Sequence, residues 1–204
     1  MVSNYDDNVF INCPFDIDYA LNLQAITFTV YRCGFVPVSA LSEDNALHNR
    51  LSKIEKLVET SKYGIHDISR TELSSSGFPR FNMPFELGVF FGAKKYGNKY
   101  QKRKNALIFE KTKFTYQNYM SDLNGIDTKA HNNDTSIIIQ SIRDWLKTSS
   151  SRAAIPGNVT IIYNFENFQA SLPAILTGLG LESATLTFND LCLIIEEFLK
   201  PIMV

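Results

Sequence analysis

Short apolar runs alternate with segments of helical periodicity through the first half of the chain, and this alternation limits the folds open to it. The apolar runs lie at residues 9–13, 35–39, 62–68 and 105–109, and the helical segments lie between them at 17–33, 47–60 and 83–96. Neighbouring parallel strands need a crossover connection, which is usually a helix. The pattern therefore predicts a parallel sheet with helices on both faces.

We expect the alternation to cease beyond Asn124. Residues 1–123 are predicted to form an α/β domain, a flavodoxin/Rossmann-like three-layer sandwich with a mostly parallel sheet of four to five strands. Residues 124–204 are predicted to be a helical C-terminal extension packed on the same domain, with its last helix capped by Thr187 or Asn189. A strand at 159–163 is an alternative interpretation. The extension either covers one face of the sheet or offers a surface for a partner or for self-association.

The charge of the chain disfavours some partners. Its net charge is -1 and its pI is near 6.3, so no global positive field recruits nucleic acid or an anionic membrane. No apolar stretch approaches the length needed to span a bilayer, and the acidic N-terminus differs from a secretory signal. We therefore expect a cytoplasmic protein. The basic run at 94–104 is expected to be a solvated helix end and loop, with phosphate contact as the alternative.

The sequence lacks the motifs of several common binding sites. Cys13, Cys33 and Cys192 are widely spaced in apolar runs, which favours buried free thiols over disulfides or a zinc site. The turn after the first apolar run, Asn-Cys-Pro-Phe-Asp, has no glycine, whereas a dinucleotide-binding turn or a phosphate loop requires glycines. We expect no metal and no cofactor.

The segments that follow the strands are the places to look for a ligand, because parallel sheets bind ligands at the carboxyl ends of their strands. The segment 69–82 is rich in Ser, Gly and Pro and is long for such a connection, which favours a lid or a binding loop. The candidate binding residues in these segments are Asn12, Pro14, Phe15, Asp16, Ser69, Arg70, Arg80 and Asn82.

Two acids are the candidate catalytic residues. Glu86 follows the candidate lid in the first turn of the helical segment, with Pro84 just before it. If Met83 caps this helix, Glu86 satisfies free backbone N–H groups, and the alternative is that it faces the pocket. Asp67 ends the third strand, where an apolar layer offers it no partner except Arg70, which could instead bind a phosphate.

The neighbours of these acids have simpler explanations. His66 alternates with Asp67 and so points to the other face of the sheet, where a hydrogen-bonded structural role is expected. The segment 121–127 with His131 is expected to form a turn at Asn124-Gly125, and a contribution to the pocket rim is the alternative.

These residues carry a resemblance to a known superfamily. The segment Val9 to Asp16, the helix ending at Gly34-Phe35, the stretch from Arg50 to Ser69, and Pro84-Phe85-Glu86-Leu87-Gly88-Val89 resemble the nucleoside 2-deoxyribosyltransferase and Toll/interleukin-1 receptor (TIR)-like superfamily over residues 8–112. In the transferases a comparable Glu-Leu-Gly step carries the glycosyl-attacking glutamate, and bacterial TIR enzymes use a helix glutamate to split nicotinamide from NAD. The resemblance implies that role for Glu86 and substrate positioning for Asp67.

The leading hypothesis is therefore an N-glycosidase that cleaves the nicotinamide–ribose bond of NAD or a related nucleotide, with NAD as substrate and not as cofactor. The resemblance further implies a defence or signalling effector that self-associates as a homo-oligomer. Two alternatives are a non-catalytic module of the same fold that binds a nucleotide signal or a protein, and a phosphoacceptor receiver domain modified at Asp67. The receiver needs an acidic pair just after the first strand, where the chain offers only Asp16 and Asp18.

Overall fold

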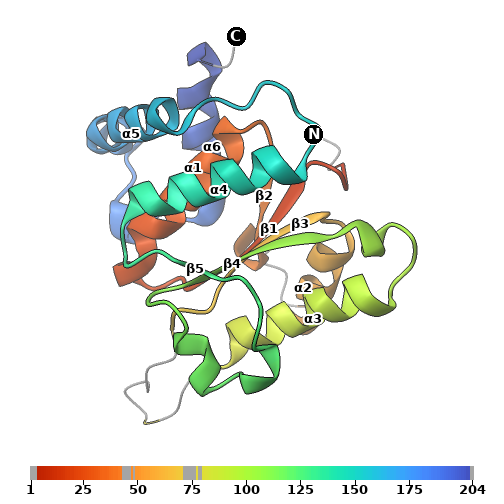
Figure 1. Cartoon of the computed structure of the whole chain (residues 1–204). Coiled ribbons are helices and arrows are strands. Elements are labelled where there is room, and N and C mark those ends of the chain that lie inside the picture. Colours follow the sequence, from red (N-terminus) through yellow and green to blue (C-terminus); the bar gives the residue numbers. More distant parts are fainter. Residues whose placement is uncertain (1–3, 43–46, 48, 71–76, 78–79, 203–204) are drawn as a thin grey trace.

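The computed structural model describes residues 4–42, 47, 49–70, 77 and 80–202, and a five-stranded parallel sheet forms its centre (Figure 1). The strands lie in the order β2-β1-β3-β4-β5, and every neighbouring pair is parallel. The predicted α/β fold with a sheet of four to five strands is confirmed. The strands are β1 (Asn8–Asn12), β2 (Val36–Val38), β3 (Tyr63–Asp67), β4 (Asn105–Glu110) and β5 (Lys129–Ala130).

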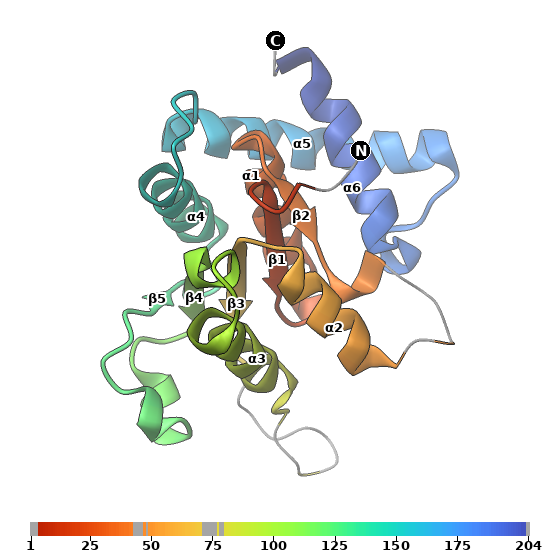
Figure 2. The ribbon, with the colours of Figure 1, turned by 90° about the vertical axis from the view of Figure 1, so that its right-hand side faces the viewer.

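Helices cover both faces of the sheet, as Figure 2 shows. The helices α1 (Ala20–Arg32) and α4 (Thr135–Ser149) lie on one face, and α2 (Arg50–Glu59) and α3 (Asn82–Tyr96) lie on the other. Every residue of β1 and β3 is buried, as expected for strands that are covered on both sides. This double burial explains why neither strand has an exposed polar face, although both contain buried polar residues.

The C-terminal helices α5 (Asn158–Leu179) and α6 (Phe188–Leu199) pack against α1 on its outer side. A phenyl cluster joins the three helices, with Phe28 of α1 centred 5.3 Å from Phe168 of α5, which is itself 5.3 Å from Phe198 of α6. Burying one such ring stabilises the fold by roughly 1.5–3 kcal/mol. Thr187 caps α6 by accepting a hydrogen bond from the backbone N–H of Asp190, which was one of the two predicted caps.

Two predictions about element bounds are wrong, and so is one alternative interpretation. The alternation does not cease at Asn124, because β5 pairs with β4 and α4 follows it as the next covering helix. A strand of two residues leaves almost no periodicity for a sequence pattern to detect. The segment 159–163 lies inside α5 and is not a strand. Helix α2 begins at Arg50, after an Asn49 cap, so the exposed Leu47 lies outside it.

Short 3₁₀ helices connect the main elements and place several residues of the site. They are η1 (Ile17–Tyr19), η2 (Ala40–Ser42), η3 (Gln101–Arg103), η4 (Thr115–Asn118), η5 (Ser121–Leu123), η6 (Ser183–Thr185) and η7 (Lys200–Ile202).

Lys104 corrects the expectation of a solvated basic segment. Its side chain is buried, and its ammonium group donates hydrogen bonds to the backbone carbonyls of Val58 and Ser61. Burial lowers the pKa of Lys104 to about 8. The ammonium group thus ties the start of β4 to the end of α2, which a run of lysines in sequence does not reveal. No helix within the described ranges combines the length and the apolar character that crossing a membrane requires.

His66 lies on the face covered by α2 and α3, as predicted, between the rings of Phe10 and Phe90. Its Nδ1 lies 3.0 Å from the amide nitrogen of Asn12. Burial and the charge of Lys104 lower the pKa of His66 from 6.5 to about 3, so the ring is neutral in the folded protein. The unfolded chain binds this proton at a higher pH than the folded chain does.

We therefore predict that His66 makes the protein acid-sensitive. Its contribution to stability is complete above pH 6.5 and is lost as the pH falls toward 3, by up to about 1.4 kcal/mol for each pH unit. Urea unfolding of the wild type and of His66→Gln at several pH values between 7 and 4 measures this contribution. The His66→Gln curve should be flatter, and two parallel curves would contradict the prediction.

Candidate active site at the carboxyl edge of the sheet

The carboxyl ends of β1 and β3 bring the predicted residues to one edge of the sheet. These strands are neighbours, and Asn12 at the end of β1 is paired with His66, next to Asp67 at the end of β3. Strand order reverses between β1 and β3, since β2 lies on one side of β1 and β3 lies on the other. Ligands of open α/β sheets bind at such a switch point.

Asp67 is fully buried and its carboxylate is surrounded by polar groups. Its Oδ1 accepts a hydrogen bond of 2.8 Å from the backbone N–H of Ser69, and its Oδ2 accepts a short one from the hydroxyl of Tyr19. The Nε2 of His131 lies 3.1 Å from Oδ2, although its N–H is poorly aligned for a hydrogen bond. Burial and the charge of Asp67 raise the pKa of Tyr19, which keeps the phenol protonated as a donor.

The segment between β5 and α4 holds His131 in this position. The backbone N–H of Asn133 donates a 2.9 Å hydrogen bond to His131 Nδ1, so the ring N–H lies at Nε2 and faces Asp67. Asn132 and Asn133 have φ values of 50° and 60°, which non-glycine residues rarely adopt. Asn tolerates this left-handed conformation better than most other residues, so the two asparagines form the turn between β5 and α4 that positions His131. His131 belongs to the site because it contacts Asp67, and the sequence offers it only as an alternative contribution to the pocket rim.

Glu86 is buried on α3, on the face of the sheet that α2 and α3 cover. Helix α3 begins at Asn82 with Phe81 as its cap, so Glu86 is its fifth residue and not a capping residue. The interpretation of Glu86 as a helix cap is therefore wrong. Among the described residues its ion-pair partner is Arg50, whose Nη2 lies 3.8 Å from Oε1, beyond hydrogen-bond distance. Burial raises the pKa of Glu86, and Arg50 only partly opposes this shift.

Asn12 connects the two halves of the edge. Its side-chain amide donates a 2.9 Å hydrogen bond to the backbone carbonyl of Met83, in the first turn of α3. Asn12 is buried, so this contact holds the helix that carries Glu86 against the end of β1. Asn12 is one of the predicted binding residues, and in this geometry it supports the position of α3.

Cys13 lies among three carboxylates. Burial raises the pKa of its thiol, and the charges of Asp67, Glu86 and Asp16 raise it further, in that order. The three acids are therefore close enough to act on one atom, although they come from three segments of the chain. The protonated thiol is a poor nucleophile.

Arg70 does not pair with Asp67, contrary to that expectation. Its guanidinium forms an ion pair with Asp16 and lies 3.9 Å from Asp18. The reason is geometric, because the Asp67 carboxylate points into the protein toward Tyr19 while Arg70 lies near the surface. Arg70 thus joins the segment after β3 to the segment after β1.

A small polar cavity of about 70 Å³ lies beside this ion pair. Two cations line it, Arg70 and Lys111, together with hydroxyl, amide and carboxyl groups that bind sugar hydroxyls or phosphate oxygens in proteins. The other lining residues are Asp18, Tyr19, Ser69 and Asn133. Lys111 and Asn133 are additions to the predicted site, from the ends of β4 and β5.

Asn12, Asp67 and Glu86 do not line this cavity, and the remaining predicted residues lie apart from it. Pro14 is buried, Phe15 is half-buried, and Arg80 and Asn82 are exposed. Most of the candidate lid at 69–82 lies outside the described residues. No group of three or more His, Cys, Asp or Glu side chains in the described part of the chain could hold a metal ion.

No protein-family model matches the chain, and no curated protein matches its sequence. The resemblance to the deoxyribosyltransferase and TIR-like superfamily therefore rests on the motifs around Asp67 and Glu86.

The two carboxylates should respond oppositely to neutralisation. Asp67→Ala leaves the Tyr19 hydroxyl and the Ser69 N–H without their acceptor, and we expect it to destabilise the protein by about 3 kcal/mol.

Glu86→Gln should stabilise the protein at pH 7, because an ionised carboxylate is costly at this buried position. This gain should shrink as the pH falls toward 4.5, where the wild-type residue also becomes neutral. Urea unfolding measures both, and a loss of stability in Glu86→Gln would contradict the assignment.

Proposed function

We propose that this protein cleaves the N-glycosidic bond between nicotinamide and ribose in NAD, or the corresponding bond of a related nucleotide. The observation that carries the proposal is the state of Glu86, a buried carboxylate at the carboxyl edge of the sheet with only a distant, half-exposed cation beside it. A helix cap or a close salt bridge would explain a buried glutamate, and Glu86 has neither among the described residues.

The chemistry needs such a group. When the bond between the anomeric carbon and the nicotinamide nitrogen breaks, the electron pair stays on nitrogen and the base leaves neutral. The ribose passes through an oxocarbenium-like state, which a nearby carboxylate stabilises or attacks. Water then adds to the anomeric carbon and loses a proton, or another hydroxyl acceptor takes its place. A carboxylate in a low-dielectric site acts on the developing cation more strongly than one in water.

The burial of Glu86 also has a cost that function can explain. Its raised pKa means that the folded state pays for an anion that no close partner compensates. Proteins keep such destabilising groups at sites where activity requires them. In the proposed reaction the positive charge of the ribose supplies the missing partner.

In this proposal Asp67 is a positioning residue. Its carboxylate has no exposed surface, so it acts by fixing Tyr19, Ser69 and His131 around the polar cavity. Arg70 and Lys111 then bind phosphate oxygens, and the polar groups of the cavity bind ribose hydroxyls. The resemblance extends the proposal to a defence or signalling effector that works as a homo-oligomer.

A non-catalytic nucleotide-binding module is the second candidate. The Glu86 side chain is only 4% exposed, which favours a role in a rigid binding site over contact with a substrate. This candidate predicts a heat of binding for ADP-ribose without release of nicotinamide from NAD.

The deciding experiment incubates the purified protein with NAD and measures free nicotinamide by chromatography. We expect release by the wild type and a loss of at least about 100-fold in kcat/KM for Glu86→Gln. The control is Glu166→Gln, which neutralises an exposed glutamate on α5 that lines neither cavity and should leave the rate unchanged. Equal rates for wild type and Glu86→Gln would remove Glu86 from the reaction, and no release by any variant would favour the binding module.

A further inference from the structure

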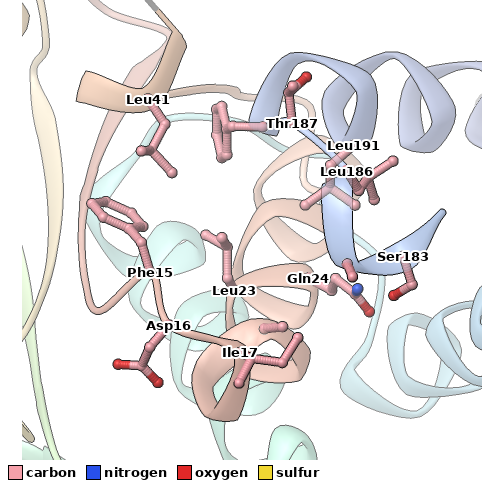
Figure 3. Close-up of a pocket in the computed structure, with 13 residues that line it drawn as sticks. Phe15, Asp16, Ile17, Leu23, Gln24, Leu41, Ser183, Leu186, Thr187 and Leu191 are labelled. Carbon is pink, nitrogen blue, oxygen red and sulfur yellow. The ribbon is translucent and has the colours of Figure 1, made fainter. Parts of the chain in front are cut away.

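A second cavity, of about 200 Å³, lies next to the site on the side of the C-terminal helices (Figure 3). Its walls come from the segment after β1, the start of α1, the segment after β2, and the residues from η6 into α6. It thus lies at the same carboxyl edge as Asp67 and Glu86, and the C-terminal region closes it.

The walls suit a flat apolar ring. Figure 3 shows Phe15 and Leu41 on one side, Leu186 and Leu191 of the C-terminal region on the other, and Leu23 of α1 between them. Pockets that enclose a drug-sized ligand have volumes of roughly 300–1,000 Å³. This smaller cavity fits one ring system of a ligand and not a complete dinucleotide.

Polar groups inside the cavity can select the ring. Gln24 accepts a 2.9 Å hydrogen bond from the Gln169 amide at its Oε1, which leaves its own NH₂ group as a donor. Within the described residues, neither this NH₂ group nor the hydroxyl of Ser183 has a hydrogen-bond partner. Both side chains line the cavity and appear on the same side of it in Figure 3. Two donors complement a ring that carries acceptor atoms, such as a ring nitrogen or a carbonyl oxygen.

An ion pair links this cavity to the polar one. Asp16 lines the apolar cavity, and Arg70, its partner, lines the polar cavity. Helix η1 separates them, since Ile17 lies on the apolar side and Asp18 and Tyr19 lie on the polar side. One molecule with an aromatic ring at one end and hydroxyl or phosphate groups at the other matches this pair of cavities.

We propose that the apolar cavity binds the heterocyclic base of a nucleotide, so that the C-terminal helices determine which nucleotide the protein accepts. The identification of the ligand as a nucleotide rests on the proposed function, whereas the preference for a ring with acceptor atoms follows from the cavity itself. This assignment gives the C-terminal region a role in the site beyond covering α1.

Ala184→Trp tests the proposal, because this exposed residue of η6 lines the cavity and a large ring there fills it. Ala154→Trp is the matched control, an exposed alanine that does not line the cavity. Gln24→Leu removes the donor and keeps the size of the side chain. Calorimetric titrations use two probes with different bases, AMP and nicotinamide mononucleotide, and thermal unfolding checks that each variant is folded.

We expect at least one probe to bind the wild type, with Ala184→Trp weakening its binding at least about 10-fold, Gln24→Leu weakening it less, and Ala154→Trp leaving it unchanged. The probe that binds more tightly identifies the base.

The NAD assay on the same variants separates the two proposals. Probe binding that Ala184→Trp weakens, without NAD cleavage by the wild type, supports the base cavity and overturns the glycosidase. NAD cleavage with the same KM in wild type and Ala184→Trp overturns the base cavity alone, and binding of neither probe overturns it as well.

Discussion

The crossover connections of the parallel sheet are the constraint on which this site depends. Each connection returns the chain to the opposite end of the sheet, so that all five strands finish at one edge. Residues far apart in sequence, such as Asp16, Asp67 and His131, therefore meet without any motif that links them. The amide of Asn12 completes this arrangement by holding the first turn of α3, and with it Glu86, against the end of β1.

The two acids of the site are buried in contrasting environments. Asp67 accepts hydrogen bonds from a phenol and a backbone N–H, which offset the cost of removing a carboxylate from water. Glu86 has a cation at 3.8 Å and no close donor among the described residues, so its burial is poorly offset. This difference is what assigns a positioning role to Asp67 and a reactive role to Glu86 in the proposed function.

Much of the fold follows from periodicity, and the exceptions have physical causes. The apolar runs predict four of the five strands, and alternation along β3 places His66 and Asp67 on opposite faces. The two-residue strand β5 is too short for a pattern, so the sequence favours a turn at Asn124-Gly125 and offers His131 at the pocket rim only as the alternative, whereas His131 contacts Asp67. The partner of Arg70 depends on where a carboxylate points, which spacing in the sequence does not specify. Lys104 is buried because two backbone carbonyls accept its hydrogen bonds, and a run of lysines in the sequence does not predict this burial.

The central claim is that Glu86 is a carboxylate whose ionisation the fold opposes. A ¹³C NMR titration of the glutamate carboxyl carbons measures this property directly, with the Glu86→Gln spectrum identifying the Glu86 signal. The account predicts a midpoint above the ordinary value of 4.5, because burial outweighs the effect of Arg50. A midpoint at or below 4.5 would show that close donors or cations compensate the carboxylate, and the basis for its proposed role in the reaction would be lost.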